Sequence, residues 1–339
     1  MKTKVVFFEV NNFEKRRIPR EIKKAGLKID YILIPDELTK ENVHLAKGAS
    51  VVSVFIYSKL DSELVKALAK MGVKLITTRS TGFNHIDLNA CRKNKIVVSN
   101  VPCYGATTVA EHTFALILTI SRKINEALAR TKCGDFSLKG LRGFDLEGKT
   151  IGVIGTGRIG REVVRIARGF NMKVICYDIF KNPQVEKVAK YVDLDTLLSK
   201  SDIVTLHLPL LKDTRHILNS NNLNNIKKGA VLINTARGEL IETRALINAL
   251  DSGRISFAGL DVLEAETLFK DKEMIEKASS KNLEELKTAL LNLDLIKRQN
   301  VIVTPHNAFN TEEAATRIIR TTLNNVSSFM QGNPINKVN

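Results

Sequence analysis

Three polar residues of types that can bind or react with a substrate lie in the second half of the 339-residue chain: Arg237, Glu266 and His306. Each comes soon after a β-branched, apolar run. An arginine can hold a carboxylate with its planar fork of donors, and a histidine can exchange a proton near neutral pH. In doubly wound α/β sheets, ligands bind outside the carboxyl ends of the strands. Taken singly, each residue also has a structural interpretation: Arg237 as a helix cap, Glu266 as a surface residue, and His306 as a hydrogen-bonded turn residue.

Residues 155–160 form a GxGxxG segment that lies between a strand-like and a helix-like run. Asp178 ends the next strand-like run, eighteen residues beyond Gly160, which is the context of a dinucleotide-binding turn. Gly155 permits the tight turn, Gly157 lets a pyrophosphate approach the backbone, and Gly160 allows close helix–strand packing. The helix N-terminus supplies amide donors to the pyrophosphate. Asp178 can accept hydrogen bonds from ribose hydroxyls and repels a 2′-phosphate, so the segment predicts NAD rather than NADP.

Short β-branched runs alternate with helix-like segments, which indicates an α/β protein with parallel sheets. The expected strands are 5–10, 31–34, 51–56, 75–78, 96–99, 150–154, 173–177, 203–208, 230–234, 256–260 and 301–304. The expected helices are 19–25, 41–46, 62–71, 107–132 (capped by Thr107 or Thr108), 159–169, 244–252 and 312–331. A turn-rich linker, 140–148, precedes the second series, and the last helix is expected to return to the first domain.

Composition and charge narrow the classes of partner. No apolar run reaches the ~20 residues of a membrane-spanning helix, and no export signal is recognised, so we expect a cytoplasmic protein without a membrane partner. Lys and Arg total 52 against 36 Asp and Glu, a net charge of +16. The densest basic cluster, within 15–24, has the spacing of a solvated helix face. No nucleic-acid motif accompanies it, which favours an anionic small molecule over nucleic acid.

The four cysteines, Cys91, Cys103, Cys133 and Cys176, have neither CxxC spacing nor neighbouring histidines. A disulfide framework or a zinc site is therefore not expected. The pattern predicts four reduced thiols in apolar settings and no bound metal.

Taken together, these features resemble the D-isomer-specific 2-hydroxyacid dehydrogenase family over nearly the whole chain, and within it the D-lactate dehydrogenases. The family resemblance is carried by the glycine segment, Asn-Thr-Ala-Arg-Gly at 234–238, Leu-Asp-Val-x-Glu-x-Glu at 260–266 and Thr-Pro-His at 304–306. Tyr104, Val-Ala-Glu-His-Thr at 109–113 and His-Asn-Ala-Phe at 306–309 support the subgroup.

The resemblance implies two doubly wound parallel-sheet domains with a cleft between them. A flavodoxin-like substrate domain would comprise 1–101 and 307–339, and a Rossmann-type NAD-binding domain would comprise 102–306. The implied partners are a small 2-oxo acid or 2-hydroxy acid, most simply pyruvate and D-lactate, and a second copy of the chain in a homodimer.

The resemblance also implies the site residues. Arg237 would bind the substrate carboxylate, His306 would exchange the proton of the ketone oxygen, and Glu266 would fix the histidine tautomer and favour imidazolium. The implied substrate-binding residues are Arg237, Thr81, Gly82, Tyr104, Phe309 and, as a weaker candidate, Tyr57. The implied cofactor-binding residues are Gly155, Gly157, Arg158, Ile159, Gly160, Asp178, Leu208, Pro209, Thr214, Thr235, Ala236, Asp261 and Thr108.

Two departures from the family pattern leave the exact substrate open. His306 lies forty positions beyond Glu266, a longer separation than in most of the family. Within it, 283–293 has an amphipathic helical pattern that could shape the cleft entrance, make a subunit contact or be a neutral surface insertion. Glu239 stands where small or apolar residues are usual. The alternatives are reduction of a branched 2-oxo acid, hydroxypyruvate or glyoxylate, or a role as an NAD-sensing, corepressor-like binding protein.

Overall fold

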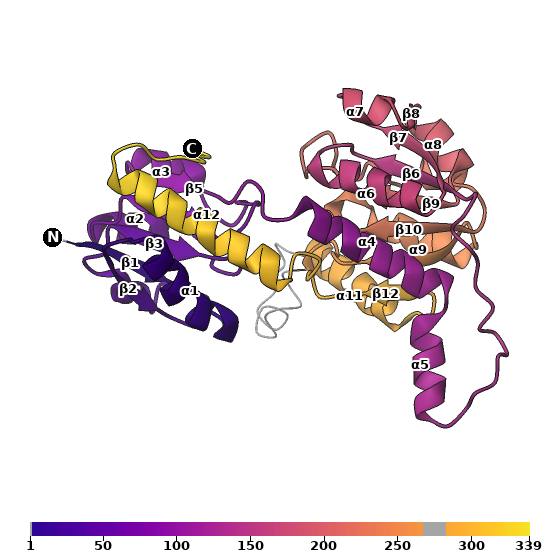
Figure 1. Cartoon of the computed structure of the whole chain (residues 1–339), viewed down its shortest axis with the longest axis horizontal. Coiled ribbons are helices and arrows are strands. Elements are labelled where there is room, and N and C mark those ends of the chain that lie inside the picture. The colour runs from indigo at the N-terminus through magenta and orange to yellow at the C-terminus, as the bar shows by residue number, and fades with distance from the viewer. Residues whose placement is uncertain (1, 267–282) are drawn as a thin grey trace. The chain divides into compact units, whose positions relative to one another are not determined.

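The computed structural model describes residues 2–266 and 283–339. The chain forms two compact units, one of Met1–Gly105 with Asn310–Asn339 and one of Ala106–Phe309 (Figure 1). The chain thus passes between the units after Gly105 and after Phe309.

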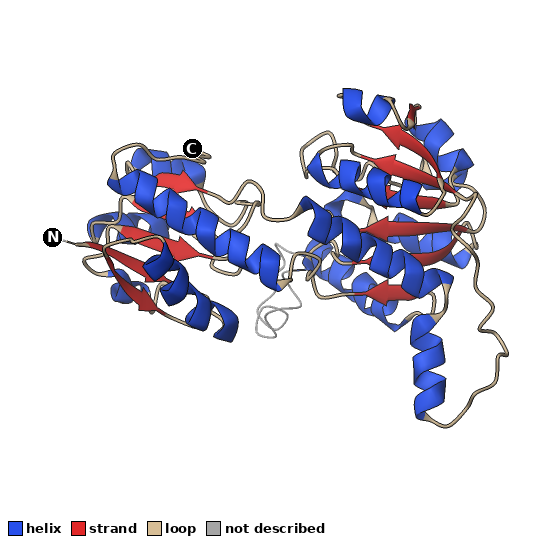
Figure 2. Ribbon diagram, in the orientation of Figure 1, coloured by secondary structure: helices blue, strands red, loops and turns tan. Residues whose placement is uncertain are grey.

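Unit 1 is built on a five-stranded parallel sheet of order β2-β1-β3-β4-β5, flanked by helices (Figure 2). Its strands are β1 (Thr3–Phe7), β2 (Ile29–Leu33), β3 (Val51–Val54), β4 (Leu75–Thr78) and β5 (Val97–Ser99). Its helices are α1 (Asn12–Lys24), the 3-10 turn η1 (Val43–Ala46), α2 (Ser62–Lys70), α3 (Leu88–Lys93) and α12 (Glu312–Met330).

The two faces of this sheet are covered by different helices because alternate strand residues point to opposite sides. Val5 and Phe7 pack in one cluster with α1 and with Leu323 of α12. Val6 and Phe8 pack in the other cluster with α2 and α3. Burial on both faces explains why the inner strands β3 and β4 are short, fully buried runs.

Unit 2 contains a seven-stranded parallel sheet of order β12-β11-β10-β9-β6-β7-β8. Its strands are β6 (Thr150–Ile154), β7 (Lys173–Tyr177), β8 (Lys190–Tyr191), β9 (Ile203–Leu206), β10 (Ala230–Asn234), β11 (Ile255–Leu260) and β12 (Val301–Val303). Its helices are α4 (Ala106–Ser121), α5 (Ile124–Lys132), α6 (Arg158–Gly169), α7 (Pro183–Glu186), α8 (Leu194–Lys200), η2 (Leu223–Asn225), η3 (Gly238–Leu240), α9 (Thr243–Asp251) and α11 (Leu283–Lys297).

Helices cover both faces of this sheet as well. Residues of α4 and α6 pack against one face, and residues of α8, α9 and α11 against the other. The strand order reverses between β6 and β9, the place where doubly wound sheets bind ligands. The predicted fold class, two doubly wound α/β domains with parallel sheets, is therefore confirmed.

Two helix predictions were wrong. The helix predicted at 19–25 begins at Asn12, because Asn11 and Glu14 form a capping box and Pro19 is accommodated inside the helix. The helix predicted over 107–132 begins at Ala106 and is two helices, because Lys123 adopts a left-handed φ of 54°. Helices α3, α7 and α8 and strand β8 were not predicted. The predicted amphipathic helix at 283–293 lies within α11, whereas 267–282 lie outside the described residues.

The cysteines occupy two kinds of setting, not one. Cys91 and Cys176 are buried, and burial raises the pKa of each thiol to about 12. Cys103 and Cys133 are exposed, so the expected apolar setting is wrong for these two. Within 2–266 and 283–339, no helix has the length and apolarity needed to cross a membrane, and no cluster of His, Cys, Asp and Glu suited to a metal ion is found.

Candidate active site

The three predicted catalytic residues follow three neighbouring strands of unit 2. Arg237 comes after β10, Glu266 after β11 and His306 after β12, and these strands are adjacent in the sheet. Since parallel strands end at one edge, the fold brings the three loops together there.

His306 and Glu266 form a direct pair. The His306 Nδ1 and Glu266 Oε1 atoms are 2.6 Å apart, and each side chain is 25% exposed. His306 has a left-handed φ of 53°, and its backbone N–H donates to the Thr304 carbonyl oxygen. With Nδ1 engaged by the carboxylate, Nε2 is the ring nitrogen with no hydrogen-bond partner among the residues described. The pair can therefore hold one tautomer and exchange a proton at Nε2.

Asp261 anchors the loop that carries His306. The Asp261 side chain is 1% exposed. Its carboxylate accepts hydrogen bonds from the Thr304 hydroxyl (2.5 Å) and from the N–H groups of Asn307 and Ala308 (both 2.9 Å). Burial acts to raise the pKa of Asp261, but hydrogen bonds from His112, Thr304 and the two backbone amides outweigh it and lower the pKa. Asp261, predicted as a cofactor contact, thus uses its oxygens to position the loop.

Arg237 lies in a turn that Asn234 organises. The Asn234 side chain accepts the Ala236 N–H (3.0 Å) and donates to the Arg237 carbonyl (2.8 Å). The guanidinium donates to the Ala236 carbonyl at 2.6 Å, and in the described part of the chain it forms no ion pair. A Cβ at Gly238 would lie 2.0 Å from the Leu263 carbonyl carbon, so glycine there lets this turn pack against the loop that leads to Glu266.

The glycine turn between β6 and α6 fits the pyrophosphate of a dinucleotide. A Cβ at Gly160 would lie 1.9 Å from the Gly155 carbonyl oxygen, which only glycine tolerates. A Cβ at Gly157 would meet nothing within 4 Å, so the space above the turn is open. Gly157 caps α6 without a side-chain hydrogen bond, so no capping side chain occupies the N-terminus of this helix, where the helix dipole favours an anion.

Asp178 lies at the end of β7 beside this turn. Its Oδ2 accepts the Thr156 N–H (2.7 Å) and hydroxyl (3.1 Å), and its Oδ1 accepts the Phe180 N–H (3.0 Å). A carboxylate offers about four acceptor positions, so the anion can still accept from a ribose hydroxyl. The residues present therefore fit NAD.

The remaining predicted cofactor residues fall into two groups. Leu208, Pro209 and Thr214 lie in the loop after β9, where the Thr214 hydroxyl donates to the Pro209 carbonyl at 2.6 Å. Thr108, Thr235 and Ala236 are buried, and the Thr235 hydroxyl is hydrogen-bonded to that of Thr113 at 3.0 Å.

The predicted substrate residues Thr81 and Gly82 lie in unit 1, directly after β4. The Ser80, Thr81 and Gly82 carbonyls accept from the Val101 N–H, the Asn100 side chain and the Ser80 hydroxyl. The Thr81 and Gly82 N–H groups have no acceptor in the part of the chain described. Two amides without an acceptor beside three engaged carbonyls can donate to an anion. Tyr104 also lies in unit 1, and Phe309 is the last residue of unit 2.

The sequence analysis did not identify two polar features near these loops, the contacts of Glu264 and the buried His207. Glu264, the first Glu of the 260–266 motif, contacts His216 Nε2 at 2.6 Å and accepts from the Thr243 hydroxyl at 2.9 Å. Asn292 of α11 donates to the Glu264 carbonyl at 2.6 Å. His207 is buried, and burial lowers its pKa to about 3. The sequence contained one signal for the Glu264 contacts, which is the position of Glu264 in the 260–266 motif.

Comparison with known proteins identifies the family. Residues 114–308 match the NAD-binding domain of D-isomer-specific 2-hydroxyacid dehydrogenases. An aromatic 2-oxoacid reductase of Clostridium sporogenes is 39% identical over 309 residues, which is 91% of this chain and 90% of that protein. The solved pyruvate reductase of Chlamydomonas reinhardtii is 38% identical, covers 98% of both chains and has a TM-score of 0.89.

A second solved structure bears on the cofactor. The D-lactate dehydrogenase of Aquifex aeolicus, solved with NAD and lactic acid, is 35% identical, covers 99% of this chain and 100% of that one, and has a TM-score of 0.83. The chain therefore belongs to the D-isomer-specific 2-hydroxyacid dehydrogenase family, as the sequence motifs predicted. It is an oxidoreductase whose cofactor is NAD.

Proposed function

We propose that this protein interconverts pyruvate and D-lactate. The observation that carries the proposal is the 2.6 Å pair of His306 and Glu266, placed on a strand edge shared with Arg237. A proton donor and a carboxylate anchor are the two groups that reduction of a 2-oxo acid requires. The motifs at 104, 109–113 and 306–309 support pyruvate as the substrate.

We assign the steps to the chain's own residues as follows. The Arg237 guanidinium binds the substrate carboxylate through two parallel hydrogen bonds, and in unit 1 the N–H groups of Thr81 and Gly82 are the proposed donors to a substrate carboxylate. When bound, NADH would donate the hydride during reduction, and NAD⁺ would accept it during oxidation. His306 Nε2 gives its proton to the ketone oxygen during reduction and removes it during oxidation, while Glu266 stabilises the imidazolium. Tyr104 and Phe309 line the side-chain end of the substrate.

A panel of 2-oxo acids tests this assignment, because oxidation of NADH is followed directly at 340 nm. We expect pyruvate to give the highest kcat/KM, by ~10-fold or more over phenylpyruvate, 2-oxoisocaproate, hydroxypyruvate and glyoxylate, and chiral chromatography to show the D-product. The aromatic 2-oxoacid reductase relative makes phenylpyruvate the second candidate. A higher kcat/KM for phenylpyruvate would transfer the assignment to aromatic 2-oxo acids.

Asp178 is expected to make the enzyme prefer NADH over NADPH by ~10²-fold or more in kcat/KM, because its carboxylate repels a 2′-phosphate in a half-buried site. Asp178→Ala should narrow that gap, chiefly by removing the repulsion of NADPH. Steady-state kinetics with both cofactors measure it, and Asp195→Ala, at an exposed position on α8, is the matched control. Lys181 is the residue that could neutralise Asp178, and equal efficiency of the unmodified protein with both cofactors would refute the assignment.

A homodimer and a cytoplasmic location stay predictions. Support for a homodimer comes from α5, in which no residue is buried. Ile124 and Leu128 on this helix and Phe136 and Leu138 after it are 43–83% exposed, which is unusual for apolar side chains that no partner covers.

A further inference from the structure

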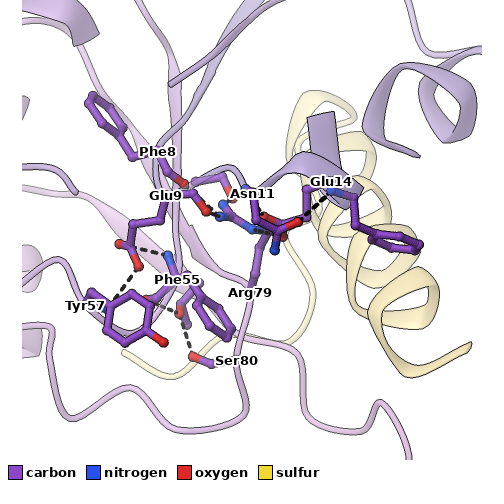
Figure 3. Close-up of polar contacts among 11 residues, drawn as sticks. Phe8, Glu9, Asn11, Glu14, Phe55, Tyr57, Arg79 and Ser80 are labelled. Atoms are coloured by element: carbon purple, nitrogen blue, oxygen red, sulfur yellow. Dashed lines mark hydrogen bonds and ion pairs between the residues drawn. The ribbon is translucent and has the colours of Figure 1, made fainter. Parts of the chain in front are cut away.

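Unit 1 contains a buried polar cluster at the carboxyl edge of its sheet, centred on Arg79 and Glu9 (Figure 3). Arg79 follows β4 and is fully buried. Its guanidinium donates to Glu14 Oε1 (2.8 Å), to the Ser53 hydroxyl (3.0 Å) and to the carbonyls of Phe8 (2.7 Å) and Glu9 (2.9 Å). One side chain thus ties the end of β4 to the end of β1, to β3 and to the first turn of α1.

Glu9 extends this connection to a further loop. Its backbone has a left-handed φ of 58°, and its side chain turns toward the segment after β3. The carboxylate accepts the N–H groups of Phe55 (3.2 Å), Tyr57 (3.0 Å) and Ser58 (3.0 Å), and it contacts the Ser58 hydroxyl. The Glu9 residue is only 8% exposed, so these bonds compete little with water.

The two segments held in this way are 55–58, after β3, and 79–82, after β4. The Glu9 carboxylate fixes the first segment by its backbone, so the rings of Phe55 and Tyr57, with centroids 5.8 Å apart, are presented from a rigid loop. Arg79 begins the second segment, whose Thr81 and Gly82 amides are free of acceptors within the described part of unit 1. The buried Arg79–Glu14 ion pair has a high desolvation cost, and it fixes the residue that begins 79–82, whereas the Glu9 carboxylate orders the backbone of 55–58.

We propose that Glu9 and Arg79 are positioning residues for substrate binding, which hold the segments 55–58 and 79–82 in the geometry that receives the 2-oxo acid. This inference rests on the proposed function. Neither side chain touches the substrate; Glu9 acts through the N–H groups of 55–58, and Arg79 acts through its own backbone and that of Glu9.

Glu9→Gln tests the proposal with little change in shape. The amide replaces one acceptor oxygen with a donor NH₂ that faces backbone N–H groups, so the 55–58 loop loosens. We expect hydrogen exchange of the Phe55, Tyr57 and Ser58 amides to accelerate by ~10-fold or more. We also expect KM for the 2-oxo acid to rise ~10-fold, kcat to change less than about 3-fold, and NADH affinity, measured by fluorescence, to stay the same.

Glu63→Gln is the matched control, since Glu63 is an exposed carboxylate of the same unit and should show none of these shifts. Arg79→Lys keeps the charge without the fork and should speed exchange in both 55–58 and 79–82. If Glu9→Gln does not fold, Ser58→Ala should give the same changes at about 3-fold, because it removes only one partner of the carboxylate.

The outcomes distinguish failure of the positioning role of Glu9 from failure of the proposed function. If hydrogen exchange of the Phe55, Tyr57 and Ser58 amides is unchanged in Glu9→Gln, Glu9 does not hold the 55–58 loop and the proposal is overturned. Faster exchange with an unchanged KM overturns the substrate role and leaves the proposed function intact. If the unmodified protein reduces no 2-oxo acid, the proposed function fails, and the substrate role fails with it, while the exchange rates still decide whether Glu9 holds the loop.

Discussion

His306→Gln is expected to lower turnover by ~10²–10⁴-fold while NADH still binds. Glutamine retains a polar side chain at this position but cannot carry a proton to the ketone oxygen at neutral pH. Because Nδ1 of His306 is engaged by Glu266, the lost function belongs to Nε2. Steady-state rates at 340 nm and NADH titration by fluorescence measure the two effects separately.

The matched control is His44→Gln, since His44 lies in the 3-10 turn η1 of unit 1 and its ring contacts only the Glu41 carbonyl in the part of the chain described. That variant should keep full turnover. Near-normal turnover in His306→Gln would remove His306 from the mechanism and leave the His306–Glu266 pair as a structural contact.

Arg237→Lys is expected to reduce kcat/KM for the 2-oxo acid by about 10²-fold, since an ammonium cannot make two parallel hydrogen bonds to a carboxylate. The positive charge is kept, so the loss reports the geometry of the fork and not electrostatic attraction alone. Most of it should appear in KM if the anchor acts equally on bound substrate and transition state. NADH affinity should not change.

Arg244→Lys provides the control for this variant, because Arg244 is an exposed residue of α9 in the same unit. It should behave as the unmodified protein does. If KM and kcat are unchanged in Arg237→Lys, the substrate carboxylate binds elsewhere, and the amides of Thr81 and Gly82 become the first place to look.

Much of the fold could be predicted because strands buried on both faces are continuous apolar runs. The predicted bounds of β4, β6, β7 and β10 agree with the structure. Helix bounds were less predictable where local signals conflict. Pro19 suggested a helix start although it lies inside α1, and nothing in the sequence marks Lys123 as the left-handed residue that separates α4 from α5.

The candidate site also contains residues whose roles could be predicted from the sequence and residues whose roles could not. Arg237, Glu266 and His306 could be found because they stand in short motifs that follow strands. The role of Asp261 could not, because a motif does not show that its oxygens bind the Thr304 hydroxyl and the backbone beyond His306. The contacts of Glu9 with 55–58 join residues 46–49 positions apart, and only the folded sheet brings them together.

The C-terminal helix α12 has a consequence for biosynthesis. Its residues Ile319, Leu323 and Val326 complete the core over Val5 and Phe7, yet the ribosome makes them after the whole of unit 2. During translation, the part of this face that α12 covers therefore stays exposed, with only α1 packed on the face, while unit 2 has all its residues and can fold. The nascent chain thus exposes apolar surface of unit 1 until α12 leaves the exit tunnel.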